Sequence, residues 1–149
     1  MNDYEVPIHR VMLVKEGKLM ASPQLRNSDT TVALVRPLCD QLDREAFWVI
    51  ALDTKNKLIG VNQVSVGTLN QNIVHPREIF KYLALCSAAA FIAVHNHPSG
   101  DPTPSIEDER ITSRLKLAGN IMGIKMLDHI VVGETGYYSF ANAGRLEEL

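Results

Sequence analysis

Apolar positions along the chain follow the period of a strand in some segments and the period of a helix in others. Apolar or alternating runs predict strands over residues 4–17, 47–53, 58–67, 90–94, 125–134 and 137–141. Helical spacing predicts helices over residues 29–45, from Pro76, and from Ser105 to about Ala118. The order β-α-β-β-α-β-α-β-β predicts an α/β sandwich with a mixed sheet, because it lacks the strict alternation of a doubly wound fold.

Two positions in this pattern conflict with simple helix rules. Pro37 lies inside the first helical segment, where it either kinks the helix or marks its start. His75 precedes Pro76 at the start of the second helix, although histidine is a poor N-cap by type. We expect a structural rather than a catalytic reason for His75.

The composition is that of an ordinary globular protein. The 149 residues, 46% hydrophobic and 21% charged, favour a single domain over residues 1–149, with 1–28 as an N-terminal strand and extension. No apolar run approaches the ~20 residues that span a bilayer, and the N-terminus lacks a signal-peptide layout, so we expect a cytoplasmic protein without a membrane partner. Cys39 and Cys86 have no CxxC spacing, which favours two buried free thiols.

The stretch AVHNHPSGDPTPSIEDER, residues 93–110, holds the candidate chemistry. Side chains alternate along a strand, so His95 and His97 leave the same face at its carboxyl end, with Cα atoms roughly 6.6 Å apart. Two imidazoles at that separation can converge on one metal ion. Asn96 points to the opposite face, where we expect a structural role.

Ser105 and Asp108 admit two interpretations. The spacing S-x-x-D is a helix-start signature, with Ser105 as the N-cap and Asp108 closing a capping box. Alternatively, Asp108 supplies an oxygen ligand beside the two histidines, and three protein ligands with one open position are typical of a catalytic zinc. The conjunction with the histidine pair favours metal binding. Asp101 is the rival oxygen ligand, but its SGDP context is typical of a turn.

The same spacing resembles a known motif. H-x-H, seven residues, S, two residues, D, at His95, His97, Ser105 and Asp108, is similar to the JAMM metallopeptidase motif. The wider sequence NIVHPREIFKYLALCSAAAFIAVHNHPSGDPTPSIEDERIT, followed by LDHIVVG and YYSF, resembles the JAB domain of the RadC family over about residues 45–140. The resemblance implies a cytidine-deaminase-like fold of the JAB/MPN type, a three-layer sandwich with a mixed sheet.

The resemblance also implies a role for each residue of the motif. His95, His97 and Asp108 would hold one Zn²⁺ per chain. Glu45, just before the first buried strand, would act as a general base that takes a proton from the zinc-bound water and passes it to the leaving amine. Ser105 would donate a hydrogen bond to the developing oxyanion.

Asp128 and His129 in LDHI match a RadC-type signature. Either they hydrogen-bond a metal ligand from outside the coordination sphere, or they pack structurally under the sheet. The residues alone leave both interpretations open.

The leading functional prediction is a zinc-dependent metallopeptidase or isopeptidase-like hydrolase. Its substrate would be an unidentified peptide or protein, and a homo-oligomer is compatible with this prediction. A DNA-repair role, by DNA binding or as a metal-dependent nuclease, is the weaker alternative. The net charge of −2 opposes it, and the chain shows no counterpart of the helix-hairpin-helix region of RadC-type proteins. A non-catalytic metal-binding scaffold is a further alternative. Nucleobase deamination is disfavoured, because its H-x-E and P-C-x-x-C patterns are missing.

Overall fold

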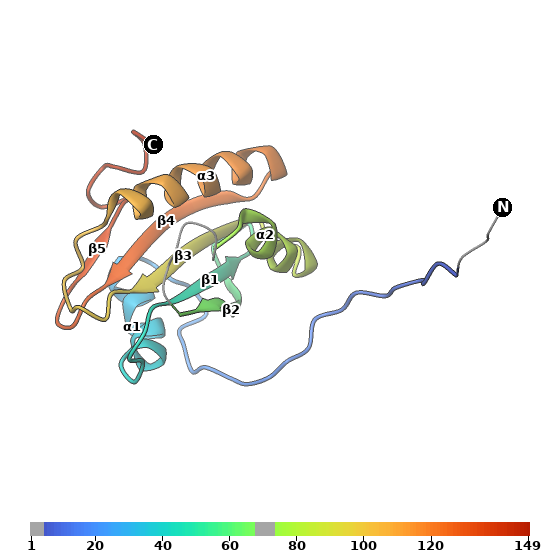
Figure 1. Ribbon diagram of the computed structural model, residues 1–149, viewed down its shortest axis with the longest axis horizontal. Coiled ribbons are helices and arrows are strands. Elements are labelled where there is room, and N and C mark those ends of the chain that lie inside the picture. Colours follow the sequence, from blue (N-terminus) through green and yellow to red (C-terminus); the bar gives the residue numbers. More distant parts are fainter. Residues whose placement is uncertain (1–4, 68–73) are drawn as a thin grey trace.

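The part of the protein that the structure describes, residues 5–67 and 74–149 of a computed structural model, folds around a mixed sheet (Figure 1). Along the chain the elements are α1 (Ser28–Cys39), β1 (Ala46–Leu52), β2 (Leu58–Val66), α2 (Pro76–Leu85), β3 (Ala90–Asn96), α3 (Ile106–Met122), β4 (Lys125–Val132) and β5 (Tyr137–Ser139). The strand order is β2-β1-β3-β4-β5. β3 and β4 pair in parallel because α3 connects them as a crossover, whereas the other neighbouring strands pair antiparallel.

Helices cover both faces of the sheet (Figure 1). On one face Val35 of α1 belongs to the same core cluster as Trp48 of β1. On the other face Leu83 of α2 and Leu115 of α3 share a core cluster with Phe47. Every residue of β1 and β3 is buried, as expected of central strands with continuous apolar runs. The predicted α/β fold with a mixed sheet and three layers is therefore confirmed.

The N-terminal strand predicted over residues 4–17 is wrong for the residues that the structure describes. Residues 5–22 form no helix or strand and are exposed, including Val6 and Ile8. A strand needs a partner for its backbone groups, and pairing begins only at Gln24, which forms an isolated bridge with Lys57, the residue before β2. The apolar residues of this segment alternate as in a strand, but no neighbouring strand pairs with its described residues.

The first helix also differs from its prediction at both ends. It starts one residue earlier than expected, because Asn27 forms a capping box with Thr30. It then runs through Pro37 without starting or stopping there, and ends at Cys39 rather than at Glu45. A proline in the last turn removes a single backbone hydrogen bond, so the helix tolerates it. The third helix continues past Ala118 to Met122.

The boundaries of the remaining elements agree with the predicted pattern. α2 begins at Pro76, and β4 and β5 form the closing hairpin. The apolar segment quoted before α2 begins at Asn72, and residues 72 and 73 lie outside the described residues. Within residues 5–67 and 74–149, no helix has the length and apolar character needed to cross a membrane.

Candidate metal centre

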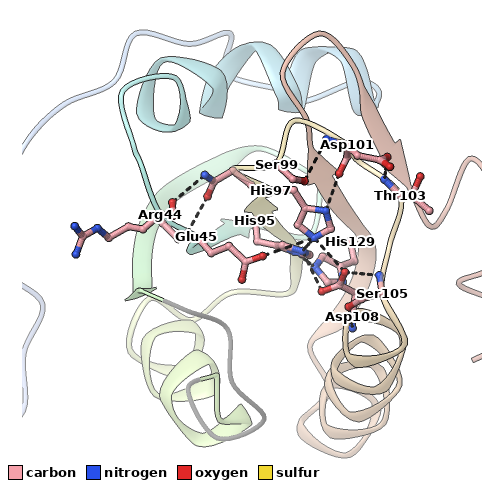
Figure 2. Close-up of polar contacts among 12 residues, drawn as sticks. Arg44, Glu45, His95, His97, Ser99, Asp101, Thr103, Ser105, Asp108 and His129 are labelled. Atoms are coloured by element: carbon pink, nitrogen blue, oxygen red, sulfur yellow. Dashed lines mark hydrogen bonds and ion pairs between the residues drawn. The ribbon is translucent and has the colours of Figure 1, made fainter.

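The carboxyl end of β3 carries the two histidines (Figure 2). Ala93 lies in the core beneath α2 and α3, and His95 follows on the same face, stacked on Phe47 with ring centroids 5.9 Å apart. The backbone N–H of His97 donates to Val132 O at 2.9 Å, which continues the parallel ladder with β4. The two Nε2 atoms lie 3.1 Å apart. Strand alternation thus places both imidazoles at one point.

Asp108 reaches the same point from the first turn of α3. Ser105 Oγ accepts from the Asp108 N–H at 3.1 Å, and Asp108 Oδ2 accepts from the Ser105 N–H at 2.7 Å, which closes a capping box. The same carboxylate faces the histidines, with Oδ1 3.1 Å from His95 Nε2 and Oδ2 3.2 Å from His97 Nε2. The two interpretations of S-x-x-D are therefore compatible, because the cap holds the carboxylate where the histidines converge.

These three side chains could hold a metal ion. One ligand atom from each of His95, His97 and Asp108 lies within 4.8 Å of the others. Two imidazole nitrogens and one carboxylate oxygen form a donor set that suits zinc and similar divalent metals. His95 and Asp108 are buried, whereas the His97 side chain is 13% exposed. The donor set and its exposure therefore fit an ion with one coordination position turned toward solvent.

Close contacts shift the pKa values of two side chains in the cluster. Burial acts to raise the pKa of Asp108, but contacts with His95 and His97 outweigh it and hold this pKa below its ordinary value. The hydrogen bond with Asp108 raises the pKa of His97, although burial opposes this shift. A carboxylate thus faces a histidine that binds a proton readily, and a metal cation at the same point would replace that proton.

The other ring nitrogen of each histidine has a defined partner. His97 Nδ1 lies 2.8 Å from Asp101 O. His95 Nδ1 lies 2.8 Å from His129 Nε2, and His129 Nδ1 lies 2.6 Å from Thr112 Oγ1. Burial lowers the pKa of His129 well below its ordinary value, so this ring is neutral. The Nδ1 atoms are therefore occupied, and the Nε2 atoms face the cluster.

Glu45 is the residue before β1, and its side chain points toward the two histidines (Figure 2). Its Oε1 lies 3.9 Å from His97 Nε2, and its side chain is 23% exposed. Asn96 fixes this segment from the opposite face of β3, because its side-chain amide donates to Arg44 O at 3.0 Å and accepts from the Ala46 N–H at 2.8 Å. Asn96 is structural, as predicted, and its two partners flank Glu45.

Asp128 and His129 have different partners, although they are neighbours on β4. His129 contacts the candidate ligand His95 directly. Asp128 accepts from Ser139 Oγ at 2.5 Å and from the Ala141 N–H at 2.9 Å, and burial raises its pKa. Within the described residues, the recorded hydrogen bonds of Asp128 do not include a candidate ligand. Of the two interpretations, the contact with a ligand fits His129 and the structural one fits Asp128.

The remaining candidates have local structural roles. Asp101 Oδ1 accepts from the Thr103 N–H at 2.9 Å within the turn, so only its backbone oxygen contacts the centre. His75 is the N-cap of α2, and its Nδ1 accepts from the Arg77 N–H at 3.1 Å. Sequence reasoning missed Thr112, because a buried helical threonine carries no signal until its neighbour on β4 is known.

The fold and the cluster define an α/β domain with a candidate metal centre at the carboxyl end of a central strand. The sequence model of the RadC-like JAB domain family matches residues 25–145, and the chain belongs to this family. It is 50% identical over 122 residues to a UPF0758 protein of Desulforudis audaxviator, covering 82% of this chain and 53% of the relative. It is 60% identical over 103 residues to a UPF0758 protein of Pelobacter propionicus, covering 69% and 45%. The chain therefore spans about half the length of these relatives.

Proposed function

We propose that the protein is a zinc-dependent hydrolase of amide bonds, of the metallopeptidase or isopeptidase type. The observation that carries this proposal is the convergence of His95, His97 and Asp108 on one point with the Glu45 carboxylate beside them. Membership of the JAB domain family supports it, because the family suggests hydrolysis.

A zinc ion bound by the three side chains would polarise the scissile carbonyl and lower the pKa of a coordinated water. Glu45 supplies the base. Its carboxylate lies 3.9 Å from His97 Nε2 and its side chain is 23% exposed, so it lies beside the cluster and within reach of solvent. There it would accept a proton from the attacking water and pass it to the leaving amine.

Ser105 supplies a hydrogen-bond donor at the rim of the centre. Its Oγ accepts from the Asp108 N–H, and a hydroxyl that accepts one hydrogen bond can still donate its own hydrogen. The residue is exposed, so a substrate carbonyl oxygen can approach it. The hydroxyl then stabilises the negative charge that develops on that oxygen.

The test is cleavage of a mixed library of linear peptides and lysine-branched isopeptides by zinc-loaded protein, read by mass spectrometry. Glu45→Gln keeps the side-chain shape but removes the base, so cleavage should fall by about 10²–10⁴-fold while zinc stays bound. Glu16→Gln, an exposed glutamate outside the centre, is the matched control and should cleave like the wild type. Undiminished cleavage by zinc-loaded Glu45→Gln would contradict the mechanism. Zinc binding without cleavage by any form would favour a scaffold.

A further inference from the structure

We propose that Thr112 and His129 act as a positioning relay that fixes the tautomer of His95 and so presents its Nε2 lone pair to the metal. The inference rests on the proposed metal centre and deepens it. It gives a role to Thr112, which lies outside the JAMM-type motif, and to the Nδ1 contact of His95.

The relay starts at the hydroxyl of Thr112, one turn of α3 beyond Asp108. Thr112 Oγ1 lies 2.5 Å from the backbone oxygen of Asp108. A carbonyl oxygen can only accept, so this bond takes the hydroxyl hydrogen. Thr112 is fully buried, which leaves water no access to rearrange the bond. Its Oγ1 can then only accept from His129 Nδ1, 2.6 Å away.

This hydrogen bond also determines which ring nitrogen of His129 carries the hydrogen. Its ring is fully buried and lies between Phe47 and Phe140, with centroid distances of 5.6 and 5.2 Å. Apolar surroundings disfavour a charged imidazole, and a neutral imidazole carries one N–H. Because that hydrogen is on Nδ1, Nε2 is an acceptor. The partner of Nε2, His95 Nδ1 at 2.8 Å, must therefore be the donor.

His95 is thereby held in the tautomer that a metal requires. A hydrogen on Nδ1 leaves the Nε2 lone pair directed at the cluster, where Nε2 lies 3.1 Å from Asp108 Oδ1. In the opposite tautomer two acceptor nitrogens would face each other in the core. His97 Nδ1 can likewise only donate, to Asp101 O at 2.8 Å, so Nε2 is the His97 atom that a metal would bind.

The direct test is the histidine ring tautomer, measured by long-range ¹H–¹⁵N correlation on wild-type protein in its metal-free and zinc-loaded forms. The relay predicts that His129 carries its hydrogen on Nδ1 in both forms. A hydrogen on Nε2 of His129 would overturn the relay. Because this measurement needs no bound metal, it separates failure of the relay from failure of the proposed function.

A pair of variants tests the consequence for metal binding. Thr112→Val keeps the shape but removes the acceptor, so His129 should shift its hydrogen to Nε2 and force the His95 hydrogen onto the ligand atom. Zinc affinity, measured by competition with a chelating indicator, should then fall by about 10–100-fold. Thr112→Ser retains the hydroxyl and should bind zinc nearly as the wild type does. A folded Thr112→Val protein with wild-type zinc affinity would refute the relay.

Discussion

His97 binds a proton more readily than an ordinary histidine, and a metal ion bound at the same point would displace that proton. Its hydrogen bond with Asp108 raises its pKa above the ordinary value of 6.5, and a metal ligand must be neutral. The contact between His97 and Asp108 therefore favours either a proton or a metal cation at the same point. The raised pKa of His97 therefore couples both stability and metal binding to pH.

The pH dependence of this pair can be measured without metal. Because the folded-state pKa of His97 exceeds the unfolded value near 6.5, the stabilisation is complete below that pH and is lost as pH rises through the folded-state pKa. The difference in unfolding free energy between chelator-treated wild type and His97→Gln should therefore shrink as pH rises, in urea titrations. Taking this difference removes the part of the opposite dependence of His129 that burial causes, which is the largest cause of its lowered pKa. A difference that grows with pH would contradict the assigned pair.

The end of β3 performs two tasks because a strand has two faces. His95 and His97 point to the cluster, and Asn96 between them points to the segment before β1, where it bonds Arg44 O and the Ala46 N–H. The strand that carries two candidate ligands thus also holds the backbone on both sides of Glu45. The pairing of β1 with β3, which places Phe47 opposite His95, brings the two segments into register.

Loss of the two Asn96 hydrogen bonds should affect both stability and the position of Glu45, the proposed base. Asn96→Ala leaves the buried Ala46 N–H without its acceptor, so we expect a loss of about 1–3 kcal/mol in unfolding free energy, measured by urea titration. Cleavage should fall while zinc affinity is retained, because Glu45 is displaced but the ligands are not. Gln63→Ala, an exposed position on the edge strand β2 that pairs with β1, serves as the control. Wild-type stability of Asn96→Ala would show that the amide does not hold this segment.

Local patterns explain which elements the sequence predicted. The apolar run before His95 predicted the buried strand, and its alternation predicted the common face of the two histidines. The spacing from Ser105 to Asp108 predicted a helix start that also presents a carboxylate. These features depend on neighbours a few residues apart, which the sequence displays directly.

Contacts between distant segments explain what the sequence could not predict. The partners of Asn96 lie 50 and 52 residues away, and Thr112 acquires its role only through His129 on another element. The resemblance to the RadC family, rather than the residues around it, singled out Glu45. The predicted N-terminal strand failed for a related reason, because alternation signals a strand whether or not a sheet edge is there to pair with it.

At the scale of the whole molecule, the centre joins the sheet to the crossover helix. The loop from His97 to Ser105 is held against the end of β4, where the Glu134 N–H donates to Gly100 O at 2.9 Å. Gly133 permits this approach, because a Cβ there would collide with Gly100 O. The start of α3 is thereby fixed relative to the end of β3. A bound ion would bridge the two elements and stabilise the folded state by mass action.

Zinc content is the measurement that tests the account most directly. Plasma mass spectrometry would compare wild type, His97→Ala and His9→Ala, each purified without chelator and then dialysed against zinc. His9 is exposed and outside the cluster, so His9→Ala is the matched control. We predict one zinc per chain in wild type and His9→Ala, and its loss in His97→Ala. A wild-type protein that takes up no zinc, or His97→Ala that retains it, would contradict the metal centre on which the proposed hydrolysis depends.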